Sequence, residues 1–411
     1  MKNILNFTKK QWPFLFLLSL AFFLWFFILF TSNTHYADEG AHHDQIRHFL
    51  NGHYDLLPFI TNIPGYHVVI ALLSKLIYFN IDKPSLQEIR LISFMFSSVS
   101  IWVFYLISKK LSHRDPLIKT LQFVFLPVIF IYFPLLYTDI FSLLIVLLAF
   151  YFMLRRQPRL SALFALVSIL IRQDDIMWVI FIWLYGYVSI YGFSVSIKML
   201  LGYVRSTYEY LFTFFAFAAF VFFNKGIAMG DKAAHEAGFY LGNVYFFLVL
   251  SGILFIPIFI TSIRKLAISK IKSILIFGVV PGALIASSFI VFPPAIHPYN
   301  LNNLKVAFLR NIILRSAYHQ YIWLYAVAIF VGYMTFFLMK FEKKNYLIFP
   351  FSFLALVPSL LVEQRYAIIP FVFLLLLRKE SDAKTEKMIV PYFFVISLAL
   401  SYMILNMNVF L

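Results

Sequence analysis

The sequence predicts an all-α protein that crosses a membrane many times. Of its 411 residues, 62% are hydrophobic, 20% are aromatic and only 13% are charged. A soluble domain is nearer half apolar and about a quarter charged, so these fractions exclude a water-soluble enzyme. They also exclude a disordered chain, which would be poor in apolar residues. Because the chain contains no Cys, disulfides and thiolate metal sites are excluded as well.

The apolar runs are justified in chain order, beginning with residues 11–31. This run is too long and too rich in Phe and Trp for a cleavable signal peptide, so we expect a retained membrane helix. Several later runs are shorter than the roughly 20 residues that a spanning helix needs. We expect one integral-membrane domain, residues 1–411, with about 11–13 transmembrane helices among the runs at 11–31, 88–108, 117–134, 139–154, 159–171, 176–192, 208–223, 240–262, 272–291, 321–340, 346–362, 366–377 and 388–409.

The charges predict how the chain sits in the membrane. If the N-terminus is cytoplasmic, the inner segments hold 23 of the 34 Lys and Arg residues, as the positive-inside rule requires. The outer segments hold 12 of the 18 Asp and Glu residues and nine of the ten His residues. The net charge of +16 is therefore an orientation signal, and no nucleic-acid partner is expected. The inner segments are the N-terminus, 109–119, 155–159, 193–207, 263–272, 340–345 and 378–387.

Residues 63–80 are apolar enough to look like a span. If they crossed the membrane, every later loop would change sides and the charge sorting would be lost. Pro64-Gly65 at the start of the run disfavours a continuous helix. We therefore expect this run to lie in the outer interface, within a large first outer loop, residues 32–87, that contains juxtamembrane helices.

The densest polar cluster opens this outer loop at Asp38-Glu39-Gly40-Ala41-His42-His43-Asp44-Gln45. It directly follows the first helix, and carboxylates near the bilayer are costly and usually functional. In a helix, Asp38 and His42 would share a face, and a carboxylate there is a candidate general base for a sugar hydroxyl. One alternative is a metal site, since Glu39 and His42 have i, i+3 spacing. The other is a solvated amphipathic helix.

Further polar clusters interrupt the apolar runs, and the map places all of them on the outer side. Each has a simpler explanation as a helix cap, a hairpin turn or a solvated loop. Their shared position at helix ends, where a lipid head group lies, favours an enzyme that acts on membrane-anchored substrates. A transporter would more typically place ionisable residues at mid-membrane and show repeats. The candidates are Asp139 after Tyr137-Thr138, Arg172-Gln173, Asp231, Lys232, His235, Glu236, His297, and Arg365-Tyr366 after Glu363-Gln364.

The order of these motifs resembles the dolichyl-phosphate-glucose α-1,2-glucosyltransferases, the family that adds the last glucose to the lipid-linked N-glycan precursor. The resemblance extends over most of the chain, and the ordered set is more specific than any single motif. It rests on Asp38-Glu39 with Gln45 and Gly52, residues 60–66, Tyr137-Thr138-Asp139, residues 160–163 leading to Arg172-Gln173, residues 176–179, Gly230-Asp231-Lys232 with His235-Glu236, His297-Pro298-Tyr299, and Arg365-Tyr366 with Pro370.

The resemblance implies a multi-pass glycosyltransferase of the GT-C class that inverts the transferred sugar. It implies Asp38 as the catalytic base, with Glu39 as the competing assignment. The donor would be a dolichyl- or polyprenyl-phosphate-glucose, and the acceptor a lipid-linked oligosaccharide on the luminal or outer face. The compartment would be the endoplasmic reticulum membrane in a eukaryote, or the cytoplasmic membrane in a prokaryote. No metal or other cofactor is implied.

The resemblance also assigns candidate roles to the outer polar residues. A lipid phosphate is already a good leaving group, so stabilising its charge matters more than protonating it. Arg365, Arg172, Lys232 and His297 are the candidates for that task, and Tyr366, Gln173 and His235 for further donor contacts. The remaining site candidates are His42, Asp139, Asp231 and Glu236.

Three departures leave the sugar and the acceptor open. Asp174-Asp175 stands where the family usually has Thr-Asn, and the segment after Tyr299 lacks the family's Asp-Asn-Arg-His-Tyr stretch. The chain is also shorter than typical members. A related mannosyl- or aminoarabinosyl-type transferase acting on protein or lipid therefore stays an alternative, as does a non-enzymatic lipid or solute transporter.

Overall fold

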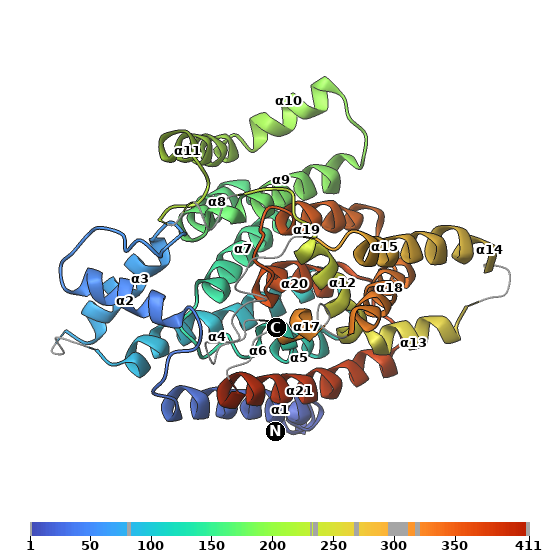
Figure 1. Ribbon diagram of the computed structural model, residues 1–411, viewed down its shortest axis with the longest axis horizontal. Coiled ribbons are helices and arrows are strands. Elements are labelled where there is room, and N and C mark those ends of the chain that lie inside the picture. The colour runs from blue at the N-terminus through green and yellow to red at the C-terminus, as the bar shows by residue number, and fades with distance from the viewer. Residues whose placement is uncertain are drawn as a thin grey trace.

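The computed structural model describes residues 2–79, 84–230, 232, 237–266, 271–294, 311–316 and 321–407. It is 76% helical and forms no strand within these ranges, apart from an isolated antiparallel bridge between Phe341 and Arg378 (Figure 1). The prediction of an all-α membrane protein is thus confirmed at the level of helices and apolarity.

Most predicted apolar runs fold as helices within a few residues of the expected bounds. They are α1 (Lys2–Thr31), α4 (Leu86–Lys110), α7 (Thr138–Leu154), α8 (Pro158–Ile171), α9 (Ile176–Tyr191), α11 (Glu209–Asn224), α18 (Ile322–Leu338), α19 (Ile348–Leu356), α20 (Ile368–Leu377) and α21 (Ala383–Met407). The side chain of Trp25 on α1 is fully buried and donates a hydrogen bond to the carbonyl of Phe130, 3.0 Å away. The first helix is therefore packed into the protein.

Other apolar runs are broken. The run at 117–134 forms α5 (Pro116–Val124) and the short α6 (Pro127–Phe130), because Pro127 cannot continue a helix. The run at 240–262 forms α12 (Gly242–Leu254) and α13 (Ile256–Arg264), which are bent by 67°. The run at 272–291 forms α14 (Ile271–Ile274), a π-helical turn (Leu275–Val279) and α15 (Val280–Val291). Short helices α10 (Ile197–Ser206) and α17 (Ile312–Ser316) and 3₁₀ turns η1 (Gln173–Asp175), η5 (Lys343–Leu347) and η6 (Gln364–Ala367) complete the set.

Four described helices are long and apolar enough to cross a membrane: Trp12–Thr31, Leu86–Lys110, Lys272–Val291 and Ala383–Asn406. The number rises to six if each of the bent pairs, α10 with α11 and α12 with α13, counts as one span. Five further apolar helices have 10–17 residues. The chain is an integral membrane protein, and the expected 11–13 spans stay a prediction, since they require several of these shorter helices to cross.

The first outer loop folds into two short helices, α2 (Glu39–Leu50) and α3 (Gly65–Ile77), which pack against each other (Figure 1). Both ends of α3 touch elements that the charge map places on the outer side. A Cβ placed at Gly65 would lie 2.2 Å from the carbonyl oxygen of Leu170, at the end of α8. At the other end, Tyr78 donates a hydrogen bond to the carbonyl of Glu88 in the first turn of α4. This arrangement fits a helix that lies along the interface.

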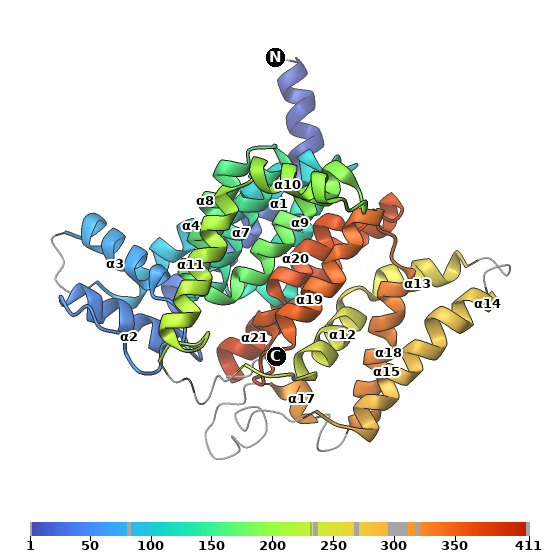
Figure 2. The same cartoon turned by 90° about the horizontal axis from the view of Figure 1, so that it is seen from above.

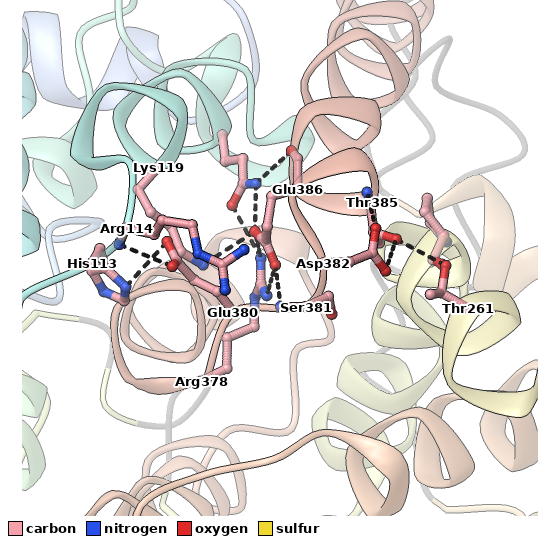
Figure 3. A network of polar contacts seen from close by, with 12 residues as sticks. His113, Arg114, Lys119, Thr261, Arg378, Glu380, Ser381, Asp382, Thr385 and Glu386 are labelled. Carbon is pink, nitrogen blue, oxygen red and sulfur yellow. Dashed lines mark hydrogen bonds and ion pairs between the residues drawn. The ribbon is translucent and has the colours of Figure 1, made fainter. Parts of the chain in front are cut away.

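Three of the segments that the charge map places on the inner side, 109–119, 263–272 and 378–387, contact one another, since Glu380 lies beside His113 and Asp382 beside Lys265. Arg378 donates to both carboxylate oxygens of Glu386, at 2.7 Å each, and to Gln122 on α5 (Figure 3). Nearby, Lys265 lies 2.6 Å from Asp382. We call these contacts the inner network. Figure 2 shows the bundle turned by 90°, with α2 and α3 at one end and α13 to α15 at the opposite end.

Candidate active site

Residues from several separate parts of the chain line one cavity of about 370 Å³, among them Ile227, Ala228 and residues of the stretch 354–361. It lies where α2, the segment 59–62, the turn η1 and the turn η6 converge. Most of its polar lining comes from clusters that sequence reasoning selected independently of one another: Asp38, His42, Thr61, Asn62, Arg172, Gln173, Asp174, Arg365 and Tyr366. The structure therefore gathers these clusters into a single site.

Asp38 lies at the N-terminal end of α2 and lines the cavity. Its side chain is 26% exposed, and its Oδ2 accepts a hydrogen bond of 2.6 Å from Arg365. The preceding residue, Ala37, has a φ of 51°, a left-handed conformation that is costly for a residue with a side chain. The backbone N–H of Asp38 also donates to the hydroxyl of Tyr137, which fixes the turn. The carboxylate is thus held in place and remains in contact with the cavity.

Glu39 has a different environment, although it is the next residue. Its side chain is 0% exposed and is bound by Arg90 through two hydrogen bonds, of 2.7 and 2.6 Å. It also accepts from the backbone N–H groups of Tyr36 and Leu136. A carboxylate with four donors has little capacity left for a substrate proton. Glu39 therefore ties the start of α2 to α4 and to the segment before α7, and both of its carboxylate oxygens are engaged.

Two arginines face the cavity, each between two carboxylates. Arg365 contacts Asp38 and Glu363, and Arg172 contacts Asp139 at 2.5 Å and Asp174 at 2.8 Å. Burial opposes their charge, but the neighbouring carboxylates outweigh it and raise the pKa of both guanidinium groups above the ordinary value. Both residues therefore stay cationic. Because an arginine has five N–H donors, each can hold its carboxylates and a phosphate oxygen together.

The neighbouring carboxyls Asp174 and Asp175 differ in charge. Burial and the nearby Asp174 raise the pKa of Asp175 well above its usual value, and Ser142 donates to it at 2.6 Å. For Asp174 the cost of burial is outweighed by Arg172, which lowers the pKa of this carboxyl. Asp174 is thus the ionised member and the one whose side chain, 52% exposed, reaches the cavity.

Gln173 and Tyr366 also line the cavity. The amide of Gln173 accepts from the N–H of Ile63 and donates to the carbonyl of Thr61, so it holds the segment around Asn62 in place. Its role in this structure is to shape the wall. Tyr366 places its ring 5.6 Å from the guanidinium carbon of Arg365, a cation–π contact.

His42 lies deeper in the same cavity and pairs with another histidine. Its Nδ1 is 3.0 Å from Nε2 of His67 on α3. Burial, followed by His67, Arg365 and Arg172, lowers the pKa of His42 well below its usual value. The imidazole is therefore neutral at physiological pH.

Seven expected site residues are not among the described residues that line this cavity, and two of them, Glu39 and Asp139, are bound by Arg90 and Arg172. Lys232 is exposed, donates to the carbonyl of Asn224 and does not line the cavity. The other four, Asp231, His235, Glu236 and His297, lie outside the described residues. The assignment of Lys232, His235 and His297 to donor binding, and of Asp231 and Glu236 to the site, stays a prediction.

Sequence reasoning did not single out Arg90, which holds Glu39. The sequence does contain a sign of its importance, because a lone arginine inside the apolar run 88–108 requires a buried partner. Tyr137 and Glu363 were noticed only as neighbours of other candidates. In the structure Tyr137 positions Asp38, and Glu363 shares Arg365 with it.

Among the described residues, one group of side chains has the spacing of a metal site. It consists of His48, His53 and Asp55, on the exposed side of the outer loop. None of the three lines the cavity. The described residues that line the cavity offer carboxylates, guanidinium groups and an imidazole.

Comparison with known proteins gives one consistent result. The family model described as "DIE2/ALG10 family" matches residues 32–193 and 186–376. A human protein named Dol-P-Glc:Glc(2)Man(9)GlcNAc(2)-PP-Dol alpha-1,2-glucosyltransferase is 25% identical over 82% of each chain. Proteins with the same name from Kluyveromyces lactis, 24% identical over 88% of this chain and 76% of the relative, and from Drosophila melanogaster, 23% identical over 82% of each, also match. No solved structure matches significantly.

Proposed function

Because the chain belongs to the DIE2/ALG10 family, we propose that it transfers glucose from a dolichyl- or polyprenyl-phosphate-glucose donor to a lipid-linked oligosaccharide, forming an α-1,2 linkage. The observation that carries the proposal is the position of Asp38, a carboxylate that lines a cavity also lined by two arginines. That combination supplies a base for a hydroxyl and positive charge for a phosphate.

In the proposed reaction, a hydroxyl oxygen of the acceptor attacks the anomeric carbon of the donor glucose. Its proton passes to Asp38 as the new C–O bond forms, because a sugar hydroxyl is too weak an acid to ionise beforehand. The bond between the anomeric carbon and the phosphate oxygen breaks on the opposite face, so the configuration inverts. The bond electrons leave with the lipid phosphate.

Arg365 and Arg172 stabilise this leaving phosphate. Both are held rigidly by carboxylates before the substrate binds, and preorganised charge of this kind is the most effective form of transition-state stabilisation. Since Arg365 contacts Asp38 directly, the base and the leaving group share one guanidinium.

We propose that the cavity opens on the luminal face in a eukaryotic endoplasmic reticulum, or on the outer face of a bacterial or archaeal cytoplasmic membrane. Three of the seven inner segments, 109–119, 263–272 and 378–387, contact one another away from the cavity, which supports the assignment of the two membrane faces. The fold would then be a GT-C-type membrane domain with the N-terminus in the cytoplasm.

The test is transfer by purified wild-type and Asp38→Asn protein in lipid, with polyprenyl-phosphate-glucose and a lipid-linked acceptor. Removal of a general base lowers the rate by at least about 10²-fold, and we expect that loss in kcat. Asp44→Asn, an exposed carboxylate on the same helix α2, is the matched control and should keep wild-type activity. Retention of activity within about threefold in Asp38→Asn would remove the base assignment.

A donor panel tests the sugar. Transfer from polyprenyl-phosphate-mannose but not from the glucose donor would overturn the glucosyl assignment. The protein would still be a glycosyltransferase that uses a polyprenyl-phosphate sugar. Substrate flux into liposomes without any glycosyl transfer would show that the protein is a transporter and not an enzyme.

A further inference from the structure

His42 presents an unused hydrogen-bonding atom to the cavity. Its side chain is 6% exposed and lines the cavity one helical turn from Asp38. Nδ1 is engaged by His67, but Nε2 is buried and has no hydrogen-bond partner among the described residues. Buried polar atoms are nearly always paired in native proteins. In the wall of a ligand cavity, such an atom indicates a contact that the ligand completes.

The pairing with His67 decides what this atom offers. Only one proton lies between the two rings, so either imidazole can be the donor. If His42 donated, His67 would carry its own proton on Nδ1, which is also buried without a partner. An orphaned buried N–H is rarer than an unused acceptor. Once a ligand in the cavity engages Nε2 of His42, only Nδ1 of His67 in this pair stays unpaired. That atom is better left as an unprotonated acceptor, so His67 donates from its Nε2 and the proton of His42 lies on its own Nε2.

The resulting donor is uncharged. Burial and the neighbouring His67, Arg365 and Arg172 keep the pKa of His42 low, so that the ring does not become a cation. The two arginines already provide the charge that a phosphate requires. An uncharged, directional N–H is better suited to a sugar hydroxyl.

We propose that Nε2–H of His42 donates a hydrogen bond to a hydroxyl of the acceptor sugar, next to the hydroxyl that Asp38 deprotonates. Side chains at i and i+4 on a helix lie about 5–6 Å apart at Cβ, so two neighbouring hydroxyls of one ring can reach both. His67 is then a positioning residue that fixes the tautomer of His42. The inference rests on the proposed function, because it takes Asp38 as the base.

The first experiment compares His42→Leu with His42→Gln. Leucine removes the donor, whereas the amide nitrogen of glutamine can occupy the place of Nε2. Loss of one hydrogen bond to a buried hydroxyl lowers kcat/KM by roughly ten- to hundredfold. We expect that loss for the acceptor in His42→Leu, substantial recovery in His42→Gln, and a donor KM within about twofold of wild type in both. A rise in donor KM alone would overturn the proposal.

The second experiment tests the coupling of the two histidines. If His67 acts only through His42, the His67→Leu change should lower kcat/KM in the wild-type background and have little further effect in His42→Leu. Additive losses would contradict the positioning role. His43→Leu is the control, since His43 is a buried histidine of the same helix that pairs with His35 and does not line the cavity. It should leave kcat/KM unchanged.

The third experiment changes the acceptor, and its arm with wild-type enzyme needs no variant. An acceptor that lacks the hydroxyl beside the nucleophile should lose about the same factor with wild-type enzyme as His42→Leu loses with the natural acceptor. His42→Leu itself should no longer distinguish the two acceptors. If wild-type enzyme accepts both equally, the inference is wrong, although the proposed function stands. If wild-type enzyme transfers glucose to neither, the proposed function itself fails.

Discussion

At the scale of single residues, the structure separates two neighbouring carboxylates that sequence alone leaves equivalent. Asp38 and Glu39 both follow the first helix, and either one fits a family base. Their difference comes from Arg90, 51 positions further along, which binds Glu39 and leaves Asp38 at the cavity. The local spacing of residues cannot reveal such a distant partner, because tertiary packing decides which carboxylate is buried.

This difference predicts opposite outcomes for the two amide substitutions. Glu39→Gln leaves the guanidinium of Arg90 buried without its counter-charge, a situation that costs about 3–5 kcal/mol. We expect a clear loss of thermal stability in Glu39→Gln and little change in Asp38→Asn, measured by unfolding in detergent. A stable but inactive Glu39→Gln protein would instead make Glu39 the base.

The buried histidines predict sensitivity to acid. Burial, with His35 and Arg47 next in importance, lowers the pKa of His43 to about 4, and the pKa of His42 is also low. The unfolded chain, with imidazole pKa values near 6.5, then binds more protons than the folded protein. Stability should therefore fall as the pH drops from about 6.5 towards 4. Melting curves across this range check the prediction, and His43→Leu should reduce the slope.

At the scale of elements, apolar runs predict helices well and predict their interruptions poorly. The runs at 139–154 and 176–192 fold almost as expected, as α7 and α9. The run at 240–262 is instead bent at Phe255, next to Pro257. Mean hydropathy does not register such breaks, since proline changes the backbone without changing how apolar the segment is.

The crossing of α12 and α18 depends on a glycine. A Cβ placed at Gly332 would lie 1.9 Å from the carbonyl oxygen of Leu248, so the helices could not approach as closely. We expect Gly332→Ala to cost about 3 kcal/mol, at the upper end for overpacking, and to lower the melting temperature. Gly202→Ala on α10, where nothing lies within 4 Å of the added atom, is the control and should leave it unchanged. Equal melting temperatures for both would contradict this packing.

At the scale of the whole molecule, sequence reasoning could group the polar clusters by membrane face but could not say which of them touch. Asp38 and Arg365 are 327 positions apart, and nothing in either motif indicates the other. The charge map requires only that both lie on the same side. The further step, that they share an ion pair, depends on how α2 and η6 pack.

The absence of native Cys makes the sidedness testable. Two single-cysteine variants probe the two faces. Ser112→Cys places a thiol in an exposed loop beside the inner network, and Tyr54→Cys places one in the predicted outer loop, where the Tyr54 side chain is 89% exposed. We expect a membrane-impermeant thiol reagent, applied to sealed vesicles, to label only one of the two. Labelling of both from the same side would overturn the map.

The shortness of α20 bears on how deep in the membrane the cavity lies. Arg365 at the cavity and Arg378 in the inner network are 13 residues apart along η6 and α20, which at 1.5 Å per residue is about 20 Å. The hydrocarbon layer of a typical membrane is about 30 Å thick. If α20 spans the membrane, the surrounding protein and not the lipid accommodates this difference, because nine of the ten residues of α20 are buried inside the bundle. The phosphate of a lipid-borne donor would then have to descend into the protein, below the level of the surrounding head groups, to reach Arg365.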